Sequence, residues 1–230
     1  MNNEVKQATP MRYERKFLVT KFSHLEIEQL IKYNAACFKP EYHERNVNNI
    51  YFDTLSFESY YGNVNGETER TKARIRWYGN LFGEIVGSNL EFKIKKGLLG
   101  KKESFLLNPF SLDKHFSKRE IIRALSSEKL PSTIKNDILS MQPTLLNTYS
   151  RKYFTSADRK FRLTVDKQLQ FYGISYNKNT FLNKSTSDVV VIELKYDSSL
   201  EEEAKEIANR FPFEMTKNSK YLQGIERVLF

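Results

Sequence analysis

The segment Arg70-Thr-Lys-Ala-Arg-Ile-Arg-Trp-Tyr78 places a basic side chain at every second position. The basic residues are Arg70, Lys72, Arg74 and Arg76. The positions between them include the apolar residues Ala73, Ile75 and Trp77. A period of two is typical of a β-strand, because successive side chains of a strand point to opposite faces. The segment therefore predicts a strand with one cationic face and one apolar face.

The same alternation appears in segments 12–19, 89–95, 160–166 and 189–196. Three of these segments contain Glu-x-Lys at strand spacing, namely Glu14/Lys16, Glu91/Lys93 and Glu193/Lys195. In 160–166, Arg162 shares a face with other polar residues. Further strands are predicted at 45–53 and at 145–155, where Tyr149, Arg151 and Tyr153 are aligned.

Helices are predicted at fewer places. Ser23 and Glu26 have the spacing of a capping box and precede an apolar helical series. A helical pair is predicted within 117–140, and a helix over 200–211 is ended by Pro212. A last helix begins near Ser219. Because the strands are not regularly followed by helices, we expect an α+β fold of antiparallel strands.

The composition indicates a folded protein with an anionic partner. Hydrophobic residues make up 40% of the 230 residues, and 17 Phe and 13 Tyr can build a core. The 37 basic residues exceed the 28 acidic ones, which gives a net charge of +9. A charge excess of this size favours nucleic acid, a phosphate-rich small molecule or an anionic membrane surface as the partner.

The single cysteine, Cys37, excludes an intrachain disulfide. The sequence contains no run of about 18 apolar residues, the length that a transmembrane helix needs, so we expect no transmembrane helix. Residues 1–10 are polar and lack the apolar region of a signal peptide. We therefore expect a reducing, cytoplasmic compartment, a flexible tail over 1–10 and a single domain over 11–230.

Two interpretations of the charged strand faces remain open. A strand with one apolar and one charged face is usually half-buried, with its charges in water. These faces, however, carry many more cations than carboxylates, and like charges on neighbouring strands repel each other. A linear polyanion such as triphosphate or polyphosphate would relieve that repulsion, and a closed barrel of about eight strands could hold one extended ligand.

The minority carboxylates also allow two interpretations. Glu14, Glu91 and Glu193 could hold Mg²⁺ or Mn²⁺, which take oxygen ligands and accompany phosphates. Each could instead pair with the lysine two residues along. Lys217 and Lys220 flank the start of the last helix, where they either help to bind an anion or are simply exposed.

Several other sites are excluded. The spacing in Gly97-Leu98-Leu99-Gly100-Lys101 is not that of a Walker A loop. The three histidines, His24, His43 and His115, form no metal-binding pattern. Basic and aromatic residues interleave around Trp77, as in some single-strand binders. Because Trp77 lies on the face opposite the arginines, we expect no nucleic acid as a partner.

Eight motifs together resemble the VTC (vacuolar transporter chaperone) domain of the triphosphate tunnel metalloenzymes. The motifs are Tyr13-Glu-Arg-Lys-Phe-Leu-Val19, Ile50-Tyr-Phe-Asp-Thr54, Arg74-Ile-Arg-Trp-Tyr-Gly79, Leu90-Glu-Phe-Lys93, Tyr149-Ser-Arg151, Phe161-Arg-Leu-Thr-Val-Asp166, Ile192-Glu-Leu-Lys195 and Lys217-Asn-Ser-Lys-Tyr221. The resemblance runs from about residue 11 to 228. It implies a closed eight-stranded antiparallel β-barrel, a tunnel with flanking helices that encloses the substrate.

The resemblance also implies roles for individual residues. The catalytic cations would be Lys16, Arg74, Arg76, Lys93, Arg151 and Arg162. Substrate binding is predicted for Lys217 and Lys220 from the resemblance, and for Lys72, Lys95, Lys195 and Tyr149 from the strand pattern. The resemblance implies Glu193 as the main metal ligand, and the residue pattern adds Glu14 and Glu91 as candidate ligands. Many hydrolases of the superfamily begin with Glu-x-Glu-x-Lys, whereas here Arg12 occupies the first Glu position, which favours a polymerase-like tunnel.

The predicted function is therefore polyphosphate synthesis from ATP with Mn²⁺ or Mg²⁺, as eukaryotic VTC domains perform. The alternatives are an inorganic triphosphatase of the same fold and a non-catalytic polyphosphate- or triphosphate-binding module. The sequence leaves room for a separate membrane partner.

Overall fold

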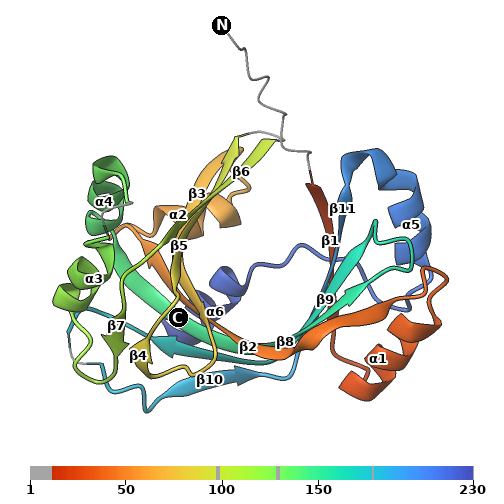
Figure 1. The fold of residues 1–230 in the computed structure, drawn as a ribbon, viewed down its shortest axis with the longest axis horizontal. Coiled ribbons are helices and arrows are strands. Elements are labelled where there is room, and N and C mark those ends of the chain that lie inside the picture. The colour runs from red at the N-terminus through yellow and green to blue at the C-terminus, as the bar shows by residue number, and fades with distance from the viewer. Residues whose placement is uncertain (1–11, 97–98, 128–129, 178, 230) are drawn as a thin grey trace, which may run out of the picture.

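The computed structural model describes residues 12–96, 99–127, 130–177 and 179–229. These residues form a strongly curved antiparallel sheet (Figure 1). The strands are β1 (Arg12–Val19), β2 (Lys39–Asp53), β3 (Glu69–Tyr78), β4 (Gly83–Ile85), β5 (Asn89–Lys96), β6 (Leu99–Leu106), β7 (Phe110–Leu112), β8 (Gln142–Thr155), β9 (Arg162–Gly173), β10 (Lys184–Ser187) and β11 (Val190–Asp197). The helices are α1 (His24–Tyr33), α2 (Glu58–Val64), α3 (Lys118–Leu125), α4 (Ser132–Leu139), a 3₁₀ turn (Ser198–Leu200), α5 (Glu201–Asn209) and α6 (Lys220–Val228).

The large sheet has the strand order β1-β11-β9-β8-β2-β3-β5-β6, with β10 pairing to β9, and every pairing is antiparallel. A small second sheet pairs β4 with β7. The α+β class and the antiparallel topology are confirmed.

The sheet bends far enough to bring charged side chains from near its two ends within ion-pair distance. Lys93 Nζ of β5 lies 3.9 Å from Glu14 Oε1 of β1, although five strands separate β1 from β5 in the sheet. In the described ranges no pairing joins β1 to β6, so the closed barrel stays a prediction. The segment before α6 instead contacts β1, where Thr216 N donates to Lys16 O at 2.9 Å.

Alternation along the strands separates a polar concave face from an apolar outer face. In β3, Ile75 and Trp77 are fully buried on the outer side with α3 and α4. In β11, Ile192 and Leu194 are buried on the outer side, in a second core that includes residues of α1 and α5. The prediction that Trp77 lies opposite the arginines is confirmed. Burial of these apolar faces leaves the charged faces directed inward.

The predicted helices are confirmed with small shifts of their ends. Ser23 Oγ accepts from Glu26 N and the Glu26 carboxylate accepts from Ser23 N, which completes the capping box of α1. The pair α3 and α4, the helix α5 before Pro212, and α6 with Ser219 as its N-cap also agree with the prediction. The sequence analysis did not predict α2, β4, β6, β7 or β10.

Asp53 joins α2 and α6 to the sheet. Its carboxylate accepts from Ser59 N at 2.9 Å and from Tyr60 N at 3.0 Å, in the first turn of α2. Tyr221 of α6 donates its hydroxyl to Asp53 Oδ2 at 2.6 Å. A buried carboxylate near a helix N-terminus is stabilised by the free N–H groups there. This accounts for the Asp53 position in the motif Ile50-Tyr-Phe-Asp-Thr54.

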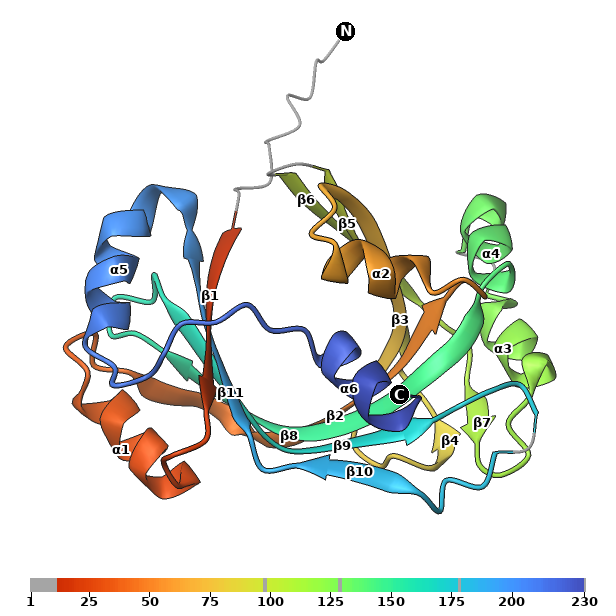
Figure 2. The same cartoon turned by 180° about the vertical axis from the view of Figure 1, so that it is seen from behind.

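Helix α6 lies on the concave side of the sheet (Figure 2). Gly224 makes its close approach to β8 and β9 possible, because a Cβ there would overlap Leu145 and Phe171. Tyr221 and Ile225 pack with these two residues in a third apolar cluster. The packing fills part of the concave side and directs the N-terminus of α6, with Lys220, towards the charged strand faces.

Candidate active site

Glu193 of β11 lies at the centre of a group of cations. Its carboxylate is within ion-pair distance of Lys16 (3.8 Å), Arg151 (3.6 Å), Lys195 (3.2 Å) and Lys220 (3.7 Å). Burial would raise the pKa of Glu193, but Lys220, Lys195 and Arg151 outweigh it and hold the pKa well below its ordinary value. Glu193 is therefore an anion among four cations that come from four elements.

Asp166 of β9 is an anchor of this group to which the sequence analysis gave no role. It accepts from Arg151 Nε and Nη2 at 2.5 and 2.6 Å, and its Oδ2 is 2.6 Å from Lys220 Nζ. Asp166 is fully buried. The sequence signal that could have identified Asp166 is its place two residues beyond Thr164, on the polar face of the strand. Its bidentate contact fixes the orientation of the Arg151 guanidinium.

A second group of cations surrounds Glu91 of β5. It lies on the opposite wall of the concave face, which is formed by β3, β5 and β6. Glu91 accepts from Arg74 Nη2 at 2.7 Å and from Lys102 Nζ at 2.7 Å, and Arg76 Nη1 is 3.8 Å away. Burial would raise the pKa of Glu91, but Arg74 and Arg76 outweigh it and lower the pKa to about 2. Both carboxylate oxygens are thus engaged by cations of neighbouring strands.

Tyr149 and a chain of amides connect the two groups. Arg76 Nε donates to Asn49 Oδ1 at 2.9 Å, and Asn49 Nδ2 donates to Asn147 Oδ1 at 2.9 Å. Arg76 Nη2 is 3.4 Å from the Tyr149 hydroxyl, and Lys220 Nζ lies 4.9 Å from the centre of the Tyr149 ring. The amide of Asn147 is buried and its Nδ2 has no hydrogen-bond partner in the described residues. The floor of the site therefore offers an unused donor between the two cationic walls.

Both walls also contact the segment that leads into α6. Lys72 Nζ of β3 donates to Ser219 Oγ at 3.1 Å, and Lys16 Nζ of β1 donates to Asn218 O at 3.2 Å. The start of α6 consequently lies between β1 and β3. Lysines at this end of a helix are unfavourable unless anions balance them, as Asp166 and Glu193 do for Lys220.

Two carboxylates could supply ligands to a metal ion. Glu14 Oε1 is 2.7 Å from Lys16 Nζ, and the same lysine lies 3.8 Å from Glu193 Oε1. In the described residues no group of three or more His, Cys, Asp or Glu could hold a metal alone. Mg²⁺ commonly takes one or two carboxylates and completes its coordination with phosphate oxygens and water. Glu14 and Glu193 therefore fit a divalent ion that is shared with a phosphate ligand.

Most of the predicted site residues meet on the concave face. These are Lys16, Lys72, Arg74, Arg76, Lys93, Arg151, Lys195, Lys220, Tyr149, Glu14, Glu91 and Glu193. Arg162 and Lys217 do not join the two groups: both are exposed and make no ion pair with a described residue. Arg162 lies at the first position of β9, opposite Lys195 in the adjacent strand.

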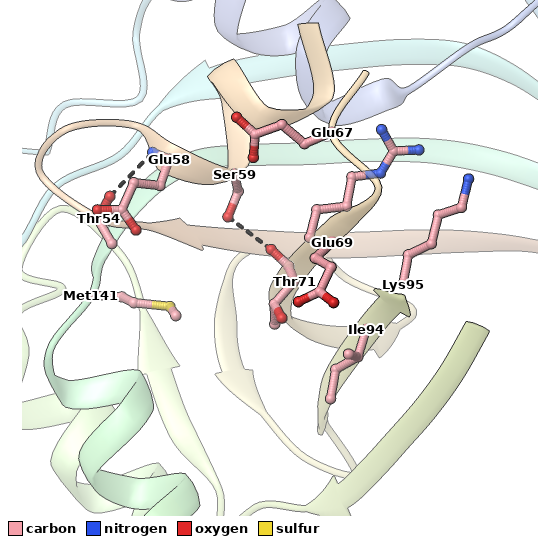
Figure 3. A pocket seen from close by; sticks show the side chains of 10 residues that line it. Thr54, Glu58, Ser59, Glu67, Glu69, Thr71, Ile94, Lys95 and Met141 are labelled. Carbon is pink, nitrogen blue, oxygen red and sulfur yellow. Dashed lines mark hydrogen bonds between the residues drawn. The ribbon is translucent and has the colours of Figure 1, made fainter. Parts of the chain in front are cut away.

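Lys95 shares the strand face of Glu91 and Lys93 but lies nearer the end of β5, where it lines a pocket of about 300 Å³ with residues of α2 and β3. Figure 3 shows Lys95 and Ile94 of β5 in this pocket with Glu58, Glu67 and Glu69. Ser59 Oγ of α2 donates to Thr71 O of β3 at 2.9 Å across it. The carboxylates at this pocket make it less cationic than the concave face.

A comparison with protein families matches the VTC domain over residues 11–229. The chain belongs to the VTC-domain family. The match includes every element that contributes a charged residue to the two groups around Glu193 and Glu91. A search of curated proteins found no significant match to this VTC domain.

Two solved structures show the same overall fold as this VTC domain. One is a candidate adenylate cyclase from Vibrio parahaemolyticus, with a TM-score of 0.51, 11% identity, and coverage of 93% of this chain and 97% of that one. The other is HpAC1 from Hippeastrum, with a TM-score of 0.50, 14% identity, and coverage of 96% and 98%. At these identities the likeness concerns the fold alone. None of the described helices has the length and apolar character needed to cross a bilayer.

Proposed function

We propose that this VTC domain transfers phosphoryl groups from ATP to the end of a linear polyphosphate chain that lies on the concave face. The observation that carries the proposal is the pair of facing cationic groups around Glu193 and Glu91, linked by Tyr149. Family membership supports it, because phosphoryl transfer needs many positive charges held in place around phosphate oxygens.

In this proposal the cations bind and neutralise the non-bridging oxygens. Arg74 and Arg76 act from one wall, and Arg151 and Lys220 act from the other. Their carboxylate partners hold them in position before substrate binds, so little reorganisation is needed when charge develops. Lys16 of β1 and Lys93 of β5 both approach Glu14, so they act from the two sides of the sheet on the same region. A terminal oxygen of the polyphosphate chain attacks the γ-phosphorus of ATP, the bond from that phosphorus to the β–γ bridging oxygen breaks, and ADP leaves, with no covalent enzyme intermediate.

The proposed metal is Mn²⁺ or Mg²⁺, held by Glu193 and Glu14 together with phosphate oxygens. When bound, such an ion neutralises charge on the phosphates and orients them. Glu91 has less freedom to act as a ligand, since Arg74 and Lys102 engage both of its oxygens. We therefore assign Glu91 to positioning Arg74, and the metal to the Glu193 side.

The closed tunnel belongs to the same proposal. β1 and β6 carry the free edges of the sheet, and cations lie on the walls near both edges. A bound polyanion would reduce the repulsion between the walls and favour their approach.

Hydrolysis is the second candidate, with water in place of the chain end as acceptor. The observation in its favour is that HpAC1, which shares the fold, is described as having a dominant triphosphatase activity. Binding without turnover is the third candidate.

One incubation separates the three functions. The purified chain is mixed with ATP and Mn²⁺, and free phosphate and long-chain polyphosphate are followed in the same tube. Long chains with little free phosphate are expected. Free phosphate alone would indicate a triphosphatase, whereas tight tripolyphosphate binding without either product would leave a binding module.

Glu193→Gln tests the metal assignment. We expect turnover to fall by about 100-fold or more, because charge stabilisation by a bound metal is worth several kcal/mol. Binding of tripolyphosphate without metal should be retained, since the cations remain, but Mn²⁺ should no longer strengthen it. Glu202→Gln, at an exposed position of α5, is the matched control. Full Mn²⁺-dependent activity in Glu193→Gln would refute the assignment.

A further inference from the structure

Arg45 of β2 lies in a cage of three tyrosines, outside the two groups around Glu193 and Glu91. Its Cζ is 5.0 Å from the ring centre of Tyr42, 5.3 Å from that of Tyr78 and 5.0 Å from that of Tyr153. Tyr42 and Tyr153 contact each other edge to face, with ring centres 5.7 Å apart. The three rings come from β2, β3 and β8, so the tertiary structure assembles the cage and holds the guanidinium through cation–π contacts.

The charge of Arg45 is not balanced by a carboxylate. In the described ranges no Asp or Glu lies within ion-pair distance of Arg45, whereas Arg151 binds Asp166 and Arg74 binds Glu91. Arg45 Nε is buried and has no hydrogen-bond partner there. Burial raises the pKa of Tyr153 to about 12, so that ring is neutral at physiological pH. The cage therefore presents a positive charge with unused N–H donors.

The position of Arg45 places it next to the candidate active site. Arg45 is the direct partner of Arg151 in the pairing of β2 with β8. Tyr153 lies on the same face as Arg151, two residues further along β8, a distance of about 7 Å along a strand. Helix α6 packs on the other side of Arg151, where Lys220 contacts Tyr149 and Asp166. A linear ligand that extends from Arg151 away from α6 would thus reach Arg45.

We propose that Arg45 and its tyrosine cage form an outer phosphate-binding subsite, which contacts the polyphosphate chain where it extends beyond the active site. The inference rests on the proposed function. Arg45 can donate two parallel hydrogen bonds to phosphate oxygens, and the rings orient it without occupying its N–H groups. The subsite contacts only ligands longer than those that the two central groups bind.

Binding of two probes to Arg45→Gln tests the subsite. Affinities for tripolyphosphate and for long-chain polyphosphate are measured by calorimetry without added ATP. We expect the variant to bind long-chain polyphosphate at least about tenfold more weakly than the original chain, since a charge-assisted contact to an anion is lost. Tripolyphosphate should bind both proteins equally well, which also shows that the variant is folded.

Arg119→Gln is the matched control, because it removes one positive charge at an exposed position of α3 and should change neither affinity. If Arg45→Gln does not fold, Arg45→Lys is measured instead; it keeps the charge but loses the planar fork, and only long-chain binding should weaken. Unchanged long-chain affinity, or an equal loss for both probes, would overturn the subsite. Failure of the original chain to bind either probe would instead refute the proposed function.

Discussion

Lys72 lies among like charges on the concave face of β3. Burial, as the largest cause, and neighbouring cations on three strands together lower the pKa of Lys72 to about 7. These cations are Arg70, Lys16, Lys93 and Arg74. The Lys72 ammonium donates to Ser219 Oγ, a neutral acceptor, at 3.1 Å. Near neutral pH, Lys72 is consequently only partly charged when no anion is present.

Polyanion binding should therefore take up a proton at Lys72. A bound phosphate raises the pKa of Lys72 again, so the complex holds more protons than the free protein above about pH 7. Affinity for tripolyphosphate should fall as the pH rises through that range. Calorimetry in two buffers of different ionisation enthalpy measures the proton uptake directly. Lys72→Arg, which stays charged, should lower the uptake, and an unchanged uptake would contradict the prediction.

The ion-pair partners of a carboxylate depend partly on its own strand and partly on the neighbouring strands. Glu14 pairs with Lys16, and Glu193 lies near Lys195, as expected for residues two apart on a strand. Glu91, in contrast, binds Arg74 of β3 and Lys102 of β6. The pairing of Glu91 follows from the neighbouring strands and could not be obtained from its own segment.

At the level of elements, α6 sets the position of Lys220. Its packing on β8 and β9 depends on Gly224, which lies against Leu145 and Phe171. Asp53 and Asp166 hold the first turn through Tyr221 and Lys220. The position of Lys220 beside Glu193 therefore depends on how α6 packs against β8 and β9.

Gly224→Ala should destabilise the protein although alanine favours helices by about 1 kcal/mol. The added Cβ overlaps buried side chains, and we expect a net loss of about 1–3 kcal/mol in the free energy of unfolding. Tripolyphosphate affinity should fall as well, because α6 and Lys220 are displaced. Denaturant unfolding and calorimetry measure the two effects. The control is Gly173→Ala, where no atom lies within 4 Å of the new Cβ; a stability gain in Gly224→Ala would contradict the prediction.

On the scale of the whole molecule, the net charge of +9 is concentrated in part on one concave face. Cations outnumber carboxylates there, and the walls carry Lys72, Lys93 and Lys102 in addition to the paired arginines. Self-repulsion of this kind is relieved by a bound anion and, less specifically, by salt.

Tripolyphosphate should therefore raise the unfolding temperature much more than NaCl of equal ionic strength. A ligand at 100 times its Kd adds about 2.7 kcal/mol to the free energy of unfolding. A single-stranded oligonucleotide should add less, because Trp77 is buried in the outer core and cannot stack on bases. Differential scanning calorimetry makes the comparison. A larger shift with the oligonucleotide would favour the nucleic-acid alternative.

The sequence by itself determined the features that depend on local pattern. Period-two alternation located the strands that carry the two cationic groups, the capping box located α1, and eight motifs indicated the VTC domain. It also identified most of the side chains on the concave face, since the face of a strand residue follows from its position in the alternation. Helix α2 and strand β6 were not predicted, because their segments lack a clear hydrophobic period.

Only the tertiary structure decided which charges meet. Strand order and curvature bring Glu14 of β1 near Lys93 of β5, place Asp166 against Arg151 and Lys220, and surround Arg45 with rings from three strands. They also leave Arg162 exposed at the end of β9. Contacts between residues far apart in the chain depend on register and bending of the whole sheet, and no local pattern carries that information.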